Sequence, residues 1–260
     1  MSTRRSFLAS LSAVATATNI PQIARAASAD FRIDGEYAYP RIGLVRSVRF
    51  YRSGDRPEVQ ILFASLLRNV TRAQIVQGSE MEIRGSQLWH LADKHNAIIG
   101  VNGGFFQGNS FAYDGLLVVG GHQLSPKNTQ FTGAAVADAD GRVSIEHVDD
   151  VKDPFSAMQS GPLFIEPGGR MGMRSHTYDL FRRSFIAQNT DTIVAGITSP
   201  VSLYQLAELL MEYPSPFLLD RFDVALSLCG AATAAFFART GKSDIRDGGA
   251  VNSPAVILFP

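Results

Sequence analysis

Runs of apolar and β-branched residues dominate the chain from about residue 41 onward. Residues 41–51 and 59–67 carry alternating or continuous apolar positions, and a turn-forming Arg-Ser-Gly-Asp-Arg-Pro stretch separates them. This pattern predicts two strands joined by a turn. Further strands are predicted where apolar runs end on glycine or proline or surround a turn, at 97–101, 114–121, 133–148, 160–170, 182–198, 224–230 and 253–259.

Two stretches change to a helical period. In residues 85–96 the apolar positions Leu88, Leu91 and Ala92 recur at helical spacing, with Ser86 as the expected N-cap. Residues 199–213 repeat the pattern more strongly, behind Ser202 as a second N-cap. Strands outnumber helices, and the helices fall between strands. We therefore expect an α/β (α+β) fold, a single domain with a large mixed central β-sheet flanked by a few helices.

The first 26 residues differ from the rest in pattern and indicate a targeting segment. Arg4 and Arg5 precede a weakly apolar stretch, and Ala24-Arg25-Ala26 resembles a cleavage site. This arrangement is typical of a twin-arginine export signal, with a disordered basic tail as the alternative. We expect residues 1–26 to be removed, residues 40–260 to form the domain, and the protein to be periplasmic or secreted, in transient contact with the twin-arginine export machinery.

Charge and composition limit the classes of partner and ligand to be expected. The 260 residues carry 24 basic and 24 acidic side chains, so nothing indicates nucleic acid as a partner. No stretch after the signal approaches twenty apolar residues, so no stable membrane insertion is expected. The histidine spacing, with His90 and His95 five apart, makes no metal signature. No metal and no cofactor are expected.

Three segments combine strand ends with glycines and small polar groups. Residues 101–108 read Val-Asn-Gly-Gly-Phe-Phe-Gln-Gly, and residues 158–169 carry Gln159 and Ser160 before Gly161. Glycines permit close backbone approach to a ligand, and an asparagine amide both donates and accepts hydrogen bonds. An ordinary tight turn over buried phenylalanine is the alternative. Arg182 and Arg183 start a strand and point to opposite faces, so at most one faces a pocket on the sheet; either can also be a plain surface charge.

The motif order resembles the phosphodiester glycosidase family, in its bacterial branch. The residues that carry the resemblance are VNGGFF, QSGPLFIEPGG, RRSFIA, SPVSLYQLAELL and VALSLCGAAT, in that order over roughly residues 40–260. The resemblance implies hydrolysis of a sugar-1-phosphodiester of an envelope or extracellular glycan. It implies catalytic roles for Asn102, Arg183 and the position of Cys229, with Arg183 meeting the phosphate. Substrate-binding roles are implied for Gly103, Gly104, Phe105, Gln159, Ser160, Gly161, Gly230 and Thr233.

Cys229, the single cysteine, stands where the family pattern reads aspartate. Ala231 and Ala232 fill the small polar positions that follow. A neutral thiol replaces a carboxylate poorly as a nucleophile, acid or hydrogen-bond acceptor. Three hypotheses stay open: a divergent enzyme, a non-catalytic phosphoglycan-binding pseudoenzyme, and a true cysteine nucleophile. Asp114 is a candidate substitute acid, although a turn role is the plainer interpretation.

Overall fold

The computed structural model describes residues 31–51, 58–78, 87–107, 111–175, 179–241 and 243–260. The expected export signal and the expected N-cap Ser86 lie outside the described residues. Among the described residues, neither helix combines the length and the apolar character of a membrane span.

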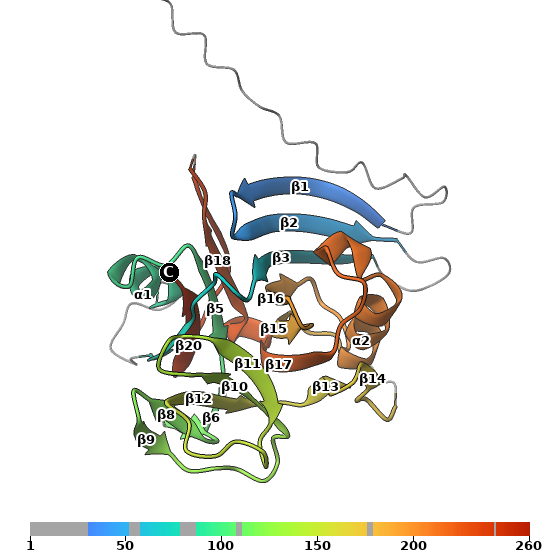
Figure 1. Cartoon of the computed structure of the whole chain (residues 1–260). Coiled ribbons are helices and arrows are strands. Elements are labelled where there is room, and N and C mark those ends of the chain that lie inside the picture. Colours follow the sequence, from blue (N-terminus) through green and yellow to red (C-terminus); the bar gives the residue numbers. More distant parts are fainter. Residues whose placement is uncertain (1–30, 52–57, 79–86, 108–110, 176–178, 242) are drawn as a thin grey trace, which may run out of the picture.

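The structure is built mainly from antiparallel sheets, as Figure 1 shows. The largest has eight strands in the order β1-β2-β3-β16-β15-β17-β13-β14. Its strands are β1 (Phe31–Tyr39), β2 (Gly43–Phe50), β3 (Val59–Leu67), β16 (Thr192–Thr198), β15 (Arg183–Gln188), β17 (Val224–Gly230), β13 (Leu163–Glu166) and β14 (Arg170–Met171).

Two five-stranded sheets and one short pair complete the strands. The second sheet runs β11 (Val143–His147), β10 (Gly133–Ala137), β12 (Ser156–Ser160), β8 (Leu117–Val119) and β9 (His122–Ser125). The third runs β19 (Asp244–Gly248), β18 (Ala235–Arg239), β5 (Ile99–Gly103), β20 (Ala255–Phe259) and β4 (Gln74–Gln77). The pair is β6 (Phe105–Phe106) with β7 (Tyr113–Asp114).

The expected single mixed central sheet is therefore wrong. Every pairing among the described strands is antiparallel, from β1 with β2 to β13 with β14. Parallel neighbours need long crossover connections, usually helical, whereas hairpins produce antiparallel neighbours. Most strands here follow one another through short turns, so the fold is β-rich with several sheets and few helices.

The two predicted helices are confirmed. They are α1 (Gln87–Lys94) and α2 (Leu203–Glu212). Ser202 caps α2 through its side chain, which accepts from the Gln205 backbone N–H, and Gln205 completes a capping box. The buried Leu206, Ala207 and Leu210 pack α2 on one face of the eight-stranded sheet.

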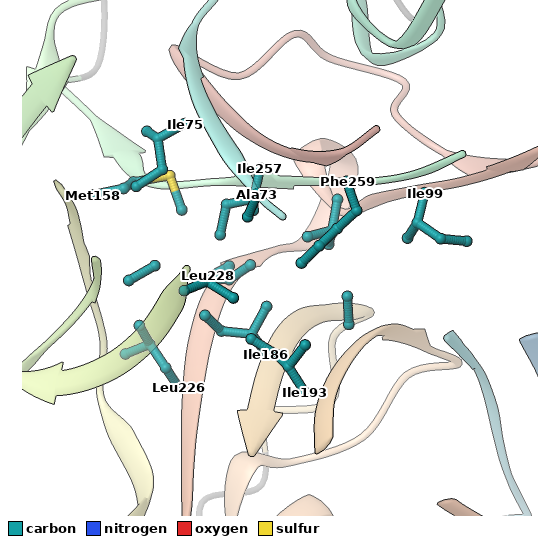
Figure 2. Packing of buried hydrophobic residues seen from close by; sticks show 14 of the residues in the cluster. Ala73, Ile75, Ile99, Met158, Ile186, Ile193, Leu226, Leu228, Ile257 and Phe259 are labelled. Atoms are coloured by element: carbon teal, nitrogen blue, oxygen red, sulfur yellow. The ribbon is translucent and has the colours of Figure 1, made fainter. Parts of the chain in front are cut away.

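The opposite face of that sheet packs against the other two sheets. Ile186 and Leu226 from the large sheet, Met158 from the second and Ile257 from the third meet in one buried cluster, and their side chains converge in Figure 2. These residues have no exposed surface. Burying each such side chain contributes about 1.5–3 kcal/mol. This shared core holds the three sheets against one another and brings the ends of β5, β15 and β17 together.

Candidate functional site

A bulge in β17 decides where the Cys229 side chain points. Ser184 of β15 pairs with Cys229, but its neighbour Phe185 pairs with Ser227, so Leu228 is an extra residue in the strand. Strict alternation would send Leu228 and Cys229 to opposite faces. Instead both belong to the core cluster shared by the three sheets. The bulge therefore aims Cys229 toward β5 and Asn102.

Asn102 links three strands through its side-chain amide. Its Oδ1 accepts from the Ser184 hydroxyl at 2.7 Å and from the Ala235 backbone N–H at 2.5 Å. Its Nδ2 donates to the Thr233 carbonyl. The side chain is almost fully buried. Asn102 is thus a brace between β5, β15 and β18 as well as a candidate catalytic group.

The Cys229 thiol is buried beside Thr233. Its Sγ contacts the Thr233 hydroxyl, which also donates to the Gly230 carbonyl at 2.9 Å. Burial raises the pKa of the thiol, and hydrogen bonds with Thr233 and Asn102 oppose that rise without reversing it. A cysteine nucleophile needs a depressed pKa. The site therefore holds a neutral thiol at neutral pH, which argues against the nucleophile hypothesis.

We expect Cys229 to react slowly with iodoacetamide in the folded protein at pH 7.5. The raised pKa keeps the thiolate scarce, and burial restricts access. The labelling rate should rise only as the pH passes above the ordinary thiol value. Mass spectrometry over a pH series measures this, with urea-unfolded protein as the control. Rapid labelling of the folded protein at neutral pH would restore the nucleophile hypothesis.

Arg183 lies half-buried beside the end of β17. A Cβ atom placed on Gly230 would lie 3.2 Å from Nη1, so glycine leaves room for the guanidinium. Nη2 donates to the Asp179 carbonyl at 3.2 Å, and the guanidinium covers the Phe181 ring at 5.2 Å. Burial lowers the pKa of Arg183, although this residue stays cationic at neutral pH. Within the described residues, no carboxylate oxygen lies at salt-bridge distance from it.

The neighbouring Arg182 behaves differently. Its Nη2 lies 2.7 Å from Asp247 Oδ1, so its charge is already neutralised. Of the two adjacent arginines, Arg183 is the one with a guanidinium left to bind an anion.

The glycines of the Asn-Gly-Gly loop make room for protein side chains. A Cβ on Gly103 would come within 2.5 Å of the Met158 methyl group, and one on Gly104 would overlap the Tyr113 ring. Gly104 also has a φ of +84°. Phe105 stacks on Phe131 at 4.7 Å between centroids. The glycines of this loop therefore allow the side chains of Met158 and Tyr113 to approach the backbone closely.

Gly104→Ala should destabilise the protein by about 3 kcal/mol, because steric overlap adds to a left-handed backbone. Gly121→Ala is the matched control: its φ is +80°, but nothing lies within 4 Å of the added methyl. It should cost about 1 kcal/mol. Urea unfolding of both variants measures the difference. Equal losses would show that packing against Tyr113 contributes nothing.

Gln159 and Ser160 are occupied by internal hydrogen bonds. Gln159 Oε1 accepts from the Leu116 and Asn128 backbone N–H groups, at 2.7 and 2.9 Å. Its Nε2 donates to the Asn128 and Phe131 carbonyls, at 2.5 and 2.8 Å. Ser160 donates to the Leu228 carbonyl at 2.8 Å. Both are fully buried. These hydrogen bonds brace β12, and a Cβ atom on Gly161 would lie 3.3 Å from Phe131 Cα. The substrate-binding roles expected for Gln159, Ser160 and Gly161 stay predictions.

The sequence patterns missed three residues. Ser184 binds Asn102, and the Tyr113 hydroxyl donates to the Gln159 carbonyl at 2.5 Å. Burial raises the pKa of Tyr113, and Cys229 adds to the rise. Asp179 supplies a negative charge near Arg183. Only the position of Ser184 beside the arginine pair hinted at a role.

Asp114, the proposed substitute acid, accepts from Asn128 Nδ2 at 2.7 Å.

The cavity at the Asn102–Thr233 contact is small. These two residues line a cavity of about 10 Å³, room for roughly one water molecule. A larger hollow of about 430 Å³ runs beside β4, β10 and β12, and no predicted site residue lines it. Around the candidate site, Arg183, Gly230 and Thr233 are half-buried, and Ala231 and Ala232 are exposed. Within the described residues, no group of three or more His, Cys, Asp or Glu has metal-binding geometry.

Comparison with known proteins agrees with the motif order. The model of the phosphodiester glycosidase family matches residues 95–215, which confirms the resemblance to that family. A search among curated proteins finds no significant match.

Two solved structures share the fold. A hypothetical protein from Synechocystis aligns with a TM-score of 0.62 at 12% identity, over 84% of this chain and 62% of the other. The chain thus spans less than two thirds of that protein. The catalytic domain of zebrafish N-acetylglucosamine-1-phosphodiester alpha-N-acetylglucosaminidase, auto-inhibited by its pro-peptide, aligns with a TM-score of 0.57 at 10% identity. That match covers 89% of this chain and 84% of the zebrafish one. Because the sequence identities are this low, the two structural similarities establish a shared fold and nothing further.

Proposed function

We propose that the protein is an exported hydrolase that cleaves a sugar-1-phosphodiester of an envelope or extracellular glycan. The observation that carries the proposal is Arg183, a half-buried cation without a carboxylate at salt-bridge distance among the described residues. A phosphodiester anion would supply the missing partner, and a guanidinium binds two phosphate oxygens at once. The family match and the zebrafish phosphodiester glycosidase support the same class of substrate.

The reaction breaks the bond between the anomeric carbon and the phosphate oxygen. Water adds its oxygen to the anomeric carbon and releases one proton to the solvent, and the phosphate leaves as a monoester with both bonding electrons. A phosphate is a much better leaving group than a sugar hydroxyl, so the departing oxygen needs little protonation. Arg183 stabilises the charge that grows on the leaving group. Asn102 holds the ends of β5 and β15 in register around this position.

Cys229 favours a second candidate function, a phosphoglycan-binding protein without turnover. The buried neutral thiol supplies neither a base nor a nucleophile at neutral pH. A protein that keeps Arg183 but lacks the family carboxylate would bind the phosphodiester and leave it intact.

The deciding experiment is hydrolysis of a panel of sugar-1-phosphodiesters by the mature protein, Cys229→Asp and Cys229→Asn. The asparagine variant is the control, since it matches aspartate in size without its charge. The proposal expects product from the natural protein on at least one substrate. Product from Cys229→Asp alone, with saturable binding by the natural protein, would establish the binding function. No binding and no product from any of the three would overturn both.

We also propose that residues 1–26 direct twin-arginine export to the periplasm or beyond, through transient contact with the export machinery. Replacing both Arg4 and Arg5 by lysine removes the paired guanidinium groups while keeping the charge. Cell fractionation should then find the variant retained in the cytoplasm as an uncleaved precursor. Export of the double variant at the natural rate would contradict this.

A further inference from the structure

The hollow of about 430 Å³ beside β4 lies along a free strand edge. β4 is the last strand of the third sheet, and its one neighbour in that sheet is β20. Gln74, Ile75 and Val76 all line the hollow, although consecutive residues of a strand point to opposite faces of its sheet. This edge hollow therefore borders the side of β4 that β20 does not cover. A further hollow of about 180 Å³ lies next along the strand, at Gln77 and Gly78.

β4 turns unpaired backbone groups toward its free edge. The Gly78 N–H donates to a carbonyl next to β20 at 2.8 Å, whereas the Ala73 N–H donates to the Gly141 carbonyl, on the opposite side, at 2.7 Å. Because this direction alternates along a strand, the N–H and C=O groups of Ile75 and Gln77 also point away from β20. Within the described part of the chain, no backbone group bonds to either of them on that side. Such a row of free groups is a template for one more strand.

The two sides of the edge hollow differ in polarity. The side formed by the second sheet is apolar and is lined by Val119, Ala137 and Phe155. Phe155 is 47% exposed, and Ile75 points to this side, into the core cluster shared by the three sheets. On the other side, Gln74 Oε1 lies 3.0 Å from His95 Nδ1. Residues that lie opposite each other on neighbouring strands share a face, so an added strand would place an apolar side chain opposite Ile75 and polar ones before and after it.

The β10–β11 turn closes the edge hollow at the N-terminal end of β4. Gly141 in that turn already holds the Ala73 N–H, so an added strand ends before this point. Every pairing among the described strands is antiparallel, including that of β4 with β20. A strand added with this orientation runs opposite to β4, and its C-terminal end then lies at the closed end. A chain that continued further would meet the turn, which favours a free C-terminus.

Arg72 supplies a cation at the closed end. It lines the edge hollow, and its Nη1 donates to the Thr71 carbonyl at 3.0 Å. Within the described residues, no carboxylate oxygen lies at salt-bridge distance from it. Asp138 and Asp140 line the same end, but both pair with Arg142, at 3.5 and 3.0 Å. A C-terminal carboxylate would complement the charge that Arg72 leaves unpaired.

We propose that the edge hollow binds the C-terminal end of a partner polypeptide, which adds to β4 as an antiparallel strand and places its carboxylate on Arg72. The backbone groups of Ile75 and Gln77 supply the strand hydrogen bonds, and the apolar side selects the side chain opposite Ile75. This interaction is independent of the proposed hydrolase function, since no residue predicted for the candidate site lines the edge hollow.

Peptide binding to the full chain tests the proposal. The probes are hexapeptides of alternating threonine and valine, in both phases, and the same pair with leucine in place of valine. Each carries an N-terminal fluorescein and a free carboxylate. Fluorescence polarisation should show saturable binding, and the C-terminal amide of the binding peptide should bind about tenfold more weakly, as expected for the loss of one charged contact. No saturable binding by any of the four, or equal binding of carboxylate and amide, overturns the proposal.

Variants of Arg72 separate charge from packing. Arg72→Gln should weaken binding of the carboxylate peptide by about tenfold and leave binding of its amide unchanged, because only the first contains the charge pair. Arg72→Lys keeps the cation and should retain most of the affinity. Equal weakening of both peptides by Arg72→Gln would overturn the placement of the carboxylate.

Gln77→Pro tests the strand pairing. Proline removes the N–H that points away from β20 and is tolerated on an edge strand, so β4 keeps its bonds to β20 while peptide binding should be lost. Gln77→Val is the matched control, because it keeps the N–H and should bind as the natural protein does. Urea midpoints show whether both variants fold. If the proline variant does not, peptides N-methylated at alternate amides replace it, and one of the two methylation patterns should abolish binding. Undiminished binding in these tests overturns the proposal.

A second copy of the chain is the competing occupant, through pairing of two β4 edges. Light scattering separates the two cases, since the proposal expects the same mass for the natural protein and Gln77→Pro. A dimer that Gln77→Pro dissociates would make the second copy the occupant and overturn the proposal.

Discussion

Arg183→Ala should reduce kcat/KM for a sugar-1-phosphodiester by about 10²–10³-fold, the loss that follows removal of one preorganised charge-stabilising group. The guanidinium lies beside Gly230, partly desolvated, and it contacts backbone carbonyls and the Phe181 ring. Its burial lowers the pKa of Arg183, and an anionic ligand would reverse that cost. Steady-state kinetics measures the effect, and calorimetric Kd values replace kcat/KM if the protein only binds.

Two further variants separate charge from geometry. Arg183→Lys keeps a cation but loses the planar fork, so it should recover only part of the loss. Arg170→Ala, at an exposed position of β14 in the same sheet, should leave the kinetics unchanged. Because Arg183 is half-exposed and makes no salt bridge within the described residues, its removal should change the urea midpoint little. Full activity in Arg183→Ala would overturn the assignment of the phosphate to this residue.

Asn102→Ala should lower the free energy of unfolding by about 3 kcal/mol, since a buried group that loses its partner costs about 1–3 kcal/mol. The change leaves the Thr233 carbonyl and the Ser184 hydroxyl without the amide that satisfies them. The Ala235 N–H keeps only its longer bond to Ser184, at 3.1 Å. Chemical denaturation measures the loss.

The control is Asn69→Ala, at an exposed position, which should change stability by no more than about 0.5 kcal/mol. Turnover of Asn102→Ala has to be measured well below its unfolding midpoint, because lost activity would otherwise report unfolding. A variant as stable as the natural protein would contradict the brace. A stable but inactive variant would point to direct contact between Asn102 and the substrate.

Local patterns predicted most elements correctly. The stretch 182–198 is predicted to form strands around a turn, and β15 and β16 do meet in a hairpin there, with Asn189 Oδ1 accepting from the Asp191 and Thr192 N–H groups. The α2 helix and its Ser202 cap are expected from the helical spacing of apolar residues over 199–213 and from one hydroxyl. These features depend on residues within one or two turns of chain, so the sequence contains their full cause.

The candidate site was predicted in part. Asn102, Arg183, Cys229 and Thr233 do come together, from strand ends that are far apart in the sequence. Gln159 and Ser160, which the sequence predicts as substrate-binding residues, use polar atoms in hydrogen bonds to the protein itself. Nothing in a linear pattern tells a polar group that faces a ligand from one that faces a backbone carbonyl. Both are small polar residues at a strand end.

The sequence by itself determined where the strands, turns and helices lie, because hydrophobic period, capping and turn chemistry act over a few residues. Only the tertiary structure decided how the strands pair, because register and direction depend on partners far along the chain. It decided that three antiparallel sheets share one core. It also decided that the bulge at Leu228 turns Cys229 inward, and that Arg182 but not Arg183 is paired with a carboxylate among the described residues. Those choices minimise buried unpaired polar groups over the whole molecule, a condition that no single segment can satisfy or reveal.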